Sequence, residues 1–264
     1  MDRPVSDLEA ETAAPLPRRV LGTEVIVVFA VSLGASGLFA LIRFLGDLAE
    51  PIPLAKQRAV VVGSYAPGQP WLDLSLQLAA IVTGLAPVAL VAYLLYRSGE
   101  SLVSIGVDFS RFGRDFLLGC VLAAVIGGSG LALYLAAHAA GVNLTVVAAD
   151  LPDVWWRIPI EILAAIQNGI LEEVLVVGYL LHRLDQMGWS PRSALLTSAA
   201  VRGSYHLYQG LGGFFGNAVM GLIFGWVYQR WHRTTPLVVA HSLIDAVAFV
   251  GYTLLVGHVS WIPS

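Results

Sequence analysis

The sequence has few charged residues and almost no cysteine. Only 12% of its 264 residues are Asp, Glu, Lys or Arg, about half of the roughly 25% that is typical of soluble domains. The single cysteine, Cys120, excludes an intrachain disulfide and a zinc cluster built from thiolates. The formal net charge of −3 also leaves no basic excess for nucleic acid, so no nucleic-acid partner is expected.

Apolar residues are abundant instead. They make up 57% of the chain, and the mean hydropathy is +0.74. A bilayer core of about 30 Å requires long apolar helices, so these values predict an all-α, polytopic transmembrane bundle with the lipid bilayer as its surroundings. Seven runs have spanning length, and the fifth is the least apolar: 21–45, 73–96, 115–138, 156–183, 192–210, 212–229 and 235–256.

The composition changes along the chain and predicts four parts. Residues 1–19 hold three prolines and charges of both signs, which is typical of a disordered tail, here placed in the cytoplasm. Residues 20–150 are expected to form N-terminal scaffold helices. Residues 151–256 are expected to form a helical core that carries the function, and 257–264 a short C-terminal tail.

Basic residues are unevenly divided between alternate loops. The N-terminal tail and every second loop hold ten arginines, whereas the other loops hold four basic residues. Because cytoplasmic loops are enriched in Lys and Arg, we expect a multi-pass protein of the plasma membrane with its N-terminus in the cytoplasm. The two sets are Arg3, Arg18, Arg19, Arg97, Arg111, Arg114, Arg183, Arg192, Arg230 and Arg233, against Arg43, Lys56, Arg58 and Arg157.

Polar residues gather in the last four apolar runs. Charges within a membrane span are costly and usually mark a site, so a polar cavity is expected among these four helices. Glu161 lies shortly after Trp155 and Trp156, so it is expected at the membrane interface. The polar residues are Glu161, Gln167, Asn168, Glu172, Glu173, Arg202, His206, Asn217, His241 and Asp245.

The spacing of these residues predicts how they face one another. Glu172 and Glu173 are adjacent and point about 100° apart on a helix, so only one can aim straight into a shared cavity. His206 lies four residues after Arg202 and shares its helical face. By the same spacing, His241 shares a face with Asp245.

This inventory is suited to activating a water molecule. A carboxylate or imidazole can serve as a general base, while further groups bind a developing oxyanion. The same side chains are also sufficient to hold one divalent metal such as zinc, with Glu172, His206 and His241 as the ligands. Both a metal-dependent and a metal-free hydrolysis therefore stay open.

The order of these motifs resembles a known family. The Glu172-Glu173 pair, then His206, then His241 four residues before Asp245 is similar to the CPBP family of intramembrane endopeptidases, which includes the CAAX prenyl endopeptidase. The resemblance implies that Glu172 activates water with His206 as its partner. It further implies that His241 and Asp245 bind the scissile carbonyl oxygen, and that Glu173 supports the site.

Two positions depart from the family pattern, within a resemblance that covers about residues 156–250. Val177 stands where the family has Arg, and Arg202 stands where it has Phe. We hypothesise that Arg202, one turn before His206, supplies the positive charge that is missing at position 177. Its guanidinium would then pair with Glu172 or Glu173.

Several functions remain compatible with the sequence. The resemblance implies a peptide or protein substrate, either prenylated or signal-like. A non-catalytic membrane binding or immunity protein on the same fold is one alternative, and a proton-coupled carrier is another. A third is a rhomboid-like serine protease using Ser129, which lies in a Gly-Gly-Ser-Gly run.

Overall fold

The computed structural model describes residues 16–263 and is mainly helical. The predicted tail 1–19 falls mostly outside this range, and its described end already belongs to the first helix. The helices are α1 (Arg18–Ala30), α2 (Leu33–Ala49), α3 (Pro70–Gly84), α4 (Ala86–Arg97), α5 (Phe112–Ala139), α6 (Arg157–Glu172), α7 (Leu180–Gln186), α8 (Pro191–Tyr205), α9 (Leu211–Trp231) and α10 (Thr235–Leu255). The strands are β1 (Arg58–Gly63) and β2 (Thr145–Asp150).

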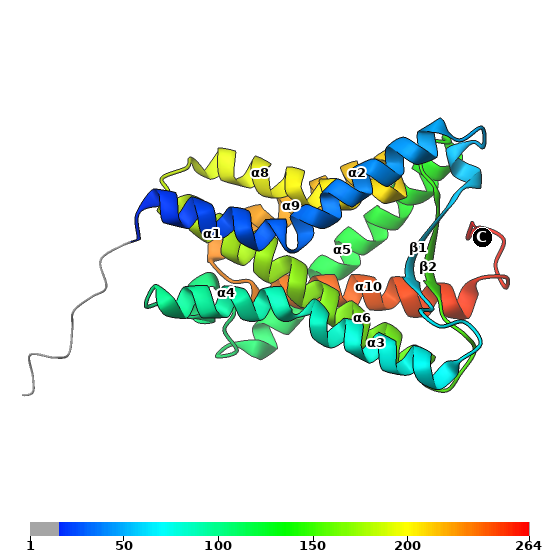
Figure 1. The fold of residues 1–264 in the computed structure, drawn as a ribbon, viewed down its shortest axis with the longest axis horizontal. Helices are drawn as coiled ribbons and strands as arrows, with labels where there is room; N and C mark the ends of the chain where they lie inside the picture. The colour runs from blue at the N-terminus through cyan, green and yellow to red at the C-terminus, as the bar shows by residue number, and fades with distance from the viewer. Residues whose placement is uncertain (1–15, 264) are drawn as a thin grey trace, which may run out of the picture.

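The helices lie roughly along one long axis, with the described N-terminal segment at one end and the C-terminus at the other (Figure 1). Four helical stretches are long and apolar enough to cross a membrane: Pro70–Arg97, Phe112–Ala139, Leu211–Trp231 and Thr235–Leu255. The pair α1–α2, bent by 50°, makes a fifth if it is counted as one span.

The structure therefore contains four or five candidate spans, compared with the seven that the sequence predicted. The other two runs correspond to α6–α7 and to α8, which do not meet the same length and hydropathy limits. α8 has only 15 residues, fewer than the roughly 20 that a spanning helix needs. These are the elements that carry Glu172, Glu173 and Arg202.

The expectation of a purely helical fold is wrong in one detail. β1 and β2 pair in parallel, from Arg58 opposite Thr145 to Gly63 opposite Asp150. Both strands are rich in valine, which favours extended structure, but at six residues each they are too short to show as spans. The sheet lies across the end of the bundle opposite the described N-terminal segment (Figure 1).

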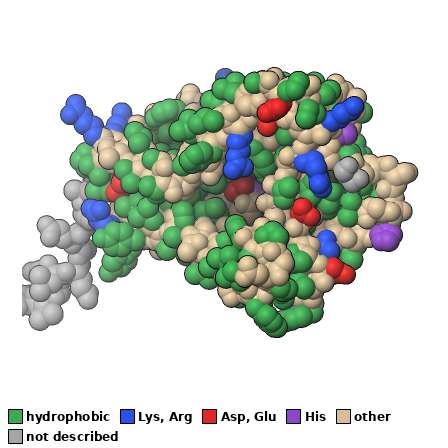
Figure 2. All heavy atoms as spheres, turned by 45° about the vertical axis from the view of Figure 1, so that its right-hand side comes forward, with side chains coloured by type: hydrophobic (Ala, Val, Ile, Leu, Met, Phe, Trp, Pro, Cys, Tyr) green, Lys and Arg blue, Asp and Glu red, His purple; other side chains and the backbone are tan. Residues whose placement is uncertain are grey.

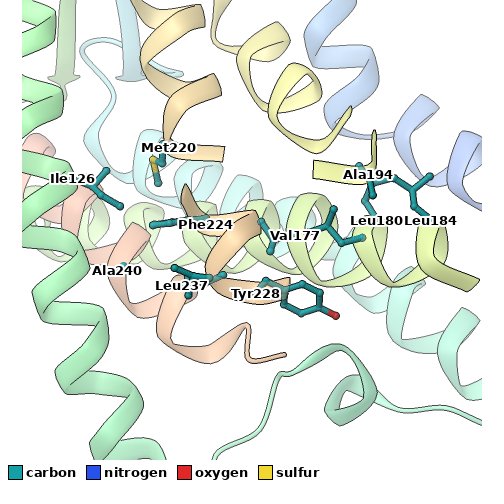
Figure 3. Close-up of a cluster of buried hydrophobic side chains, with 12 residues drawn as sticks. Ile126, Val177, Leu180, Leu184, Ala194, Met220, Phe224, Tyr228, Leu237 and Ala240 are labelled. Atoms are coloured by element: carbon teal, nitrogen blue, oxygen red, sulfur yellow. The ribbon is translucent and has the colours of Figure 1, made fainter. Parts of the chain in front are cut away.

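A hydrophobic cluster fills the other end of the bundle. Its buried side chains come from the segment after α6, from α7, from the second half of α9 and from the start of α10 (Figure 3). Val177 belongs to it, fully buried beside Leu181, Phe224 and Leu237. Close packing of this kind excludes water from that end of the molecule.

A cavity of about 1280 Å³ lies among the helices. Its walls come from α2, α3, α5, α6, α8, α9, α10 and both strands, and they include Glu172, His206, His241 and Asp245. The cavity is thus wider than the predicted one, because α5 and the sheet also line it. Much of this wall is apolar.

Candidate active site

The glutamate pair lies where α6 changes its winding. α6 continues into a π-helical segment, η4 (Glu173–Tyr179), in which all seven residues are buried. A π-helix widens the turn and is often found at functional sites. Glu172 lines the cavity, whereas Glu173 is fully buried and does not contribute to the lining. The prediction that only one of the two faces the cavity is confirmed.

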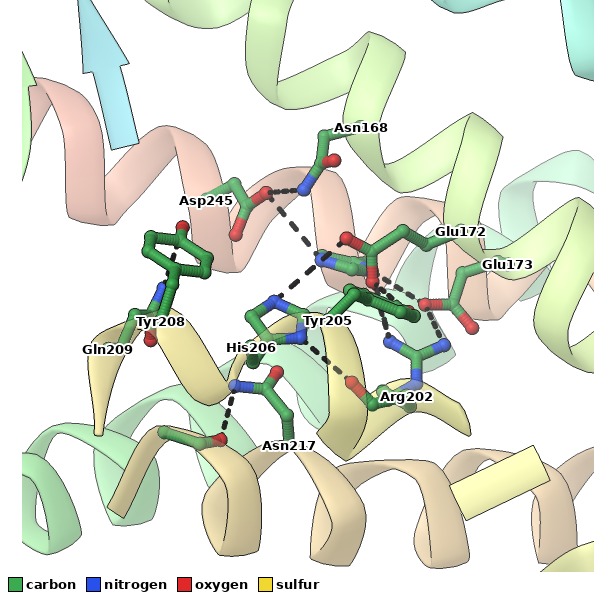
Figure 4. A network of polar contacts seen from close by, with 12 residues as sticks. Asn168, Glu172, Glu173, Arg202, Tyr205, His206, Tyr208, Gln209, Asn217 and Asp245 are labelled. Carbon is green, nitrogen blue, oxygen red and sulfur yellow. Dashed lines mark hydrogen bonds and ion pairs between the residues drawn. The ribbon is translucent and has the colours of Figure 1, made fainter. Parts of the chain in front are cut away.

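Arg202 reaches both glutamates from α8 (Figure 4). Its Nη2 donates to Glu173 Oε1 at 2.6 Å, and its Nη1 lies 3.4 Å from Glu172 Oε2. The guanidinium also lies 5.6 Å from the ring centroid of Phe224. The structural part of the Arg202 hypothesis is confirmed: α8 brings a positive charge to the paired acids, while Val177 packs in the apolar cluster.

One oxygen of the Glu172 carboxylate is held by neighbouring side chains, and the other has no close partner among them. Its Oε2 also accepts a hydrogen bond from the Tyr205 hydroxyl at 2.7 Å. Its Oε1 lies 4.0 Å from His206 Nε2. The sequence indicated only packing or cavity lining for Tyr205, and its position next to His206 is the one signal that could have shown this role.

His206 has a fixed ring orientation. Its Nδ1 lies 3.1 Å from the carbonyl oxygen of Arg202. A carbonyl only accepts, so Nδ1 carries the hydrogen and donates. In the neutral ring, Nε2 is then an acceptor that points toward Glu172 (Figure 4).

His241 links the second glutamate to Asp245. Its Nδ1 lies 2.6 Å from Glu173 Oε1, and its Nε2 lies 3.5 Å from Asp245 Oδ2. Asn168 on α6 donates to the same Asp245 oxygen at 2.8 Å. The sequence placed Asn168 among the polar groups but did not predict this contact.

The predicted divalent metal finds no matching donor set. Within residues 16–263, no three His, Cys, Asp or Glu side chains are arranged to hold a metal ion. Arg202 Nη1 lies 3.5 Å from His241 Nδ1 and 3.4 Å from Glu172, so a cation between them would meet a positive charge. Zinc bound by Glu172, His206 and His241 stays a prediction, and no step below uses a metal.

Ser129 and Glu161 make hydrogen bonds outside the network around the glutamate pair. The Ser129 hydroxyl lines the cavity but donates to the backbone carbonyl of Val125 at 2.8 Å, as serines in helices commonly do. Glu161, expected at the membrane interface, is fully buried among protein atoms. It accepts from Thr253 at 2.6 Å and pairs with Arg157 at 3.3 Å, joining α6 to α10 away from the glutamate pair.

The comparison with known families agrees with this site. Residues 154–247 match the family model described as type II CAAX prenyl endopeptidase Rce1-like. The chain carries an Rce1-like domain. No curated protein and no solved structure matches the chain.

The Rce1-like domain contains every predicted site residue, from Glu172 to Asp245, together with Arg202. The family resemblance seen in the motifs is therefore confirmed. The family is one of CAAX-type intramembrane endopeptidases, which implies peptide substrates. The several long apolar helices agree with a multi-pass membrane protein.

Proposed function

We infer that the protein is an intramembrane endopeptidase that hydrolyses a peptide bond with a water molecule activated by Glu172 and His206. The observation that carries this is the one-sided restraint of Glu172. Arg202 and Tyr205 hold Oε2, while Oε1 faces the cavity and His206 Nε2. A carboxylate positioned in this way can take a proton from a molecule in the cavity.

A single water fits the gap between these two groups. At 4.0 Å, Glu172 Oε1 and His206 Nε2 are too far apart for a direct hydrogen bond, but one water can bond to both. Glu172 accepts the proton while the water oxygen attacks the carbonyl carbon, and it then passes this proton to the leaving amine nitrogen as the C–N bond breaks. General-base assistance of this kind contributes about 10²–10⁴-fold to a rate.

His241 is suited to stabilise the oxyanion that forms. An ionised carboxylate only accepts hydrogen bonds, so Asp245 in that form cannot donate to an oxyanion. A doubly protonated His241 donates through Nδ1 to Glu173 and keeps Nε2–H for the substrate oxygen. Asp245, itself oriented by Asn168, directs that N–H, and one such donor is typically worth about 2.7–4 kcal/mol.

The decisive experiment is Glu172→Gln, an isosteric change that removes the base. Peptides from membranes of cells carrying the wild type or Glu172→Gln would be compared by mass spectrometry. We expect at least one product to vanish, with a loss of about 10²–10⁴-fold in its formation. Asp153→Asn, an exposed carboxylate in the loop before α6, is the matched control and should leave that product unchanged.

The same variant separates the other functions. A binding or immunity protein would keep its phenotype in Glu172→Gln, and a carrier would lose proton-coupled flux rather than a peptide. If every product persists in Glu172→Gln, the protease proposal is wrong. The identity of the vanished peptide would also show whether the substrate is prenylated or signal-like, which remains a proposal.

A further inference from the structure

The cavity extends from the active site toward only one end of the bundle. Its lining residues on the helices lie at 33–36 on α2, 77–84 on α3, 120–135 on α5, 164–172 on α6, 212–223 on α9 and 241–255 on α10. None comes from the first two turns of α5, from η4 or α7, from the last two turns of α9 or from the first turn of α10. These missing parts all lie at the same end, where α7 leads to α8 and α9 leads to α10.

The hydrophobic cluster closes that end. Val177, Leu181, Phe224, Val227 and Leu237 belong to this cluster, and each is at most 3% exposed. Figure 3 shows Val177, Phe224 and Leu237 within it. A peptide or a water file would have to separate these side chains to reach Glu172 from this direction. The active site is therefore closed toward the end of the bundle where α7 leads to α8 and α9 leads to α10.

The opposite end is open. Both strands contribute to the cavity wall there, through Val61 and Gly63 on β1 and Val146 and Ala148 on β2. Trp261 also lines this part of the cavity while 49% of its surface stays exposed. Figure 2, in which this end is turned toward the viewer, shows the surface hollowed between groups of hydrophobic side chains.

The basic residues distinguish the two ends. In residues 16–263, the closed end carries nine arginines and the open end carries four basic residues. Since the cytoplasmic side of a membrane protein is the one enriched in Lys and Arg, the closed end faces the cytoplasm. The nine are Arg18, Arg19, Arg97, Arg111, Arg114, Arg183, Arg192, Arg230 and Arg233, and the four are Arg43, Lys56, Arg58 and Arg157.

We propose that the active site receives its substrate from the extracytoplasmic side of the membrane. The substrate class is a polypeptide whose cleaved bond is presented at the outer face, with an apolar part that lies against the cavity wall. A cytosolic protein with a lipidated C-terminus would meet the closed, arginine-bearing end instead. The direction of access rests on the cavity and the charges, and only the cleavage itself rests on the proposed function.

Thiol labelling tests the direction of access without any need for activity. Cys120 is the only cysteine, so a Cys120→Ala background permits single probes. Ala164→Cys reports on the cavity, because Ala164 lines it two turns before Glu172. Tyr65→Cys and Val103→Cys, at residues 59% and 62% exposed, mark the open end and the closed end respectively.

A charged, membrane-impermeant maleimide would be applied to intact cells and to inverted vesicles. We expect labelling of Tyr65→Cys and Ala164→Cys in intact cells and its loss in inverted vesicles, with the reverse for Val103→Cys. Labelling of Ala164→Cys from the Val103 side, or from neither side, would overturn the proposal. Labelling of Tyr65→Cys only in inverted vesicles would overturn the orientation and with it the outer-face substrate.

The outcome is independent of the protease proposal. If labelling follows the expected pattern but Glu172→Gln changes no peptide, the cavity opens outward and the proposed function is wrong. If Glu172→Gln removes a peptide but Ala164→Cys is labelled from the cytoplasmic side, the protease stands and the direction of access is wrong. Gel filtration in detergent checks that each cysteine variant is folded.

Discussion

Arg202 holds two carboxylates that neighbour each other on α6 and η4, and this arrangement determines how the site is charged. Without it, Glu173 would be a fully buried acid facing only His241. Removing one partner of a buried ion pair commonly costs about 3–5 kcal/mol, because the remaining charge is left uncompensated. The positive charge is thus required at this place, and in this chain α8 supplies it.

Tyr205 is a positioning residue for Glu172. In Tyr205→Phe, Glu172 Oε2 loses its 2.7 Å hydrogen bond and the carboxylate can turn away from His206. Hydrogen bonds to charged groups contribute about 1.5–3 kcal/mol, so we expect the cleavage rate to fall about tenfold to a hundredfold. The measurement is kcat and KM for the peptide product identified with Glu172→Gln.

Tyr208→Phe provides the control for this prediction. The Tyr208 hydroxyl lies in the same cavity but accepts from Gln209 and makes no contact with Glu172. Its variant should retain the wild-type rate. Equal losses in Tyr205→Phe and Tyr208→Phe would show a general effect of cavity polarity and contradict the specific role of Tyr205.

At the residue scale, the sequence indicated which residues belong to the candidate site better than it indicated which contacts they make. Glu172, His206, His241 and Asp245 could be found because charges in apolar runs are rare. The contact from Arg202 followed from a missing charge at one position and an added one at another. Hydrogen bonds such as Tyr205 to Glu172 depend on side-chain directions across two helices, which spacing within one helix does not give.

At the scale of elements, Gly169 sets the distance between α6 and α10. A Cβ at this position would lie 2.5 Å from Ser242 Oγ, 2.9 Å from the Ser242 nitrogen and 3.2 Å from the Val238 carbonyl oxygen. Two of these atoms are backbone, so Gly169→Ala must move the helices apart. We expect a loss of about 1–3 kcal/mol in unfolding free energy, measured in detergent, and a lower cleavage rate because His241 moves away from Glu173.

Gly128→Ala is the matched substitution on α5. Its added Cβ would meet nothing within 4 Å. The better helix propensity of alanine should leave stability unchanged or raise it by up to about 1 kcal/mol. If Gly169→Ala is tolerated as well as Gly128→Ala, the close contact of α6 and α10 does not limit the packing.

The loop before α5 is tied to the start of α10 by a charged group outside the membrane. Asp108 accepts hydrogen bonds from the Ser110 hydroxyl and backbone and from Arg233, and these lower the pKa of Asp108 to about 2. A lowered carboxyl pKa stabilises the fold above its unfolded value of 3.8, and this stabilisation is lost as the pH falls toward 2. We therefore expect the stability advantage of wild type over Asp108→Asn to shrink across this window.

Unfolding of both proteins in detergent between pH 2 and about pH 5 measures this difference. An advantage that stays constant with pH would contradict the role of Asp108. This link could not be predicted from the sequence, because Asp108 and Arg233 are far apart in the chain and lie in different loops.

The elements also show where prediction from sequence stops. All seven apolar runs correspond to helical segments, because long apolar stretches have few other solutions in a bilayer. The strands could not be found, since six-residue valine-rich segments within long loops have no partner that local pattern identifies. The π-helical segment η4 was also not predictable, because it depends on packing around Glu173 rather than on its own residues.

At the scale of the whole molecule, the two ends of the bundle differ in both packing and charge. The apolar cluster and most of the arginines lie at one end, and the sheet and the cavity opening lie at the other. The candidate catalytic groups lie between them, where the cavity ends against the cluster. A single fold thus combines a closed side, a deep site and one direction of access.

The number of crossings determines where the C-terminus lies. Five spans, with α1–α2 counted as one, and seven, with α6–α7 and α8 added, are both odd. If the N-terminus lies in the cytoplasm, as the distribution of basic residues predicts, the C-terminus is expected outside, at the end that holds Trp261 and the sheet. We expect a periplasm-dependent reporter such as alkaline phosphatase, fused after Ser264, to be active. The same reporter inserted at Val103, in the loop after α4, should be inactive.

An inactive C-terminal fusion together with an active one at Val103 would show the opposite orientation. Two inactive fusions would mean an even number of crossings between Val103 and the C-terminus, which neither five nor seven spans allows.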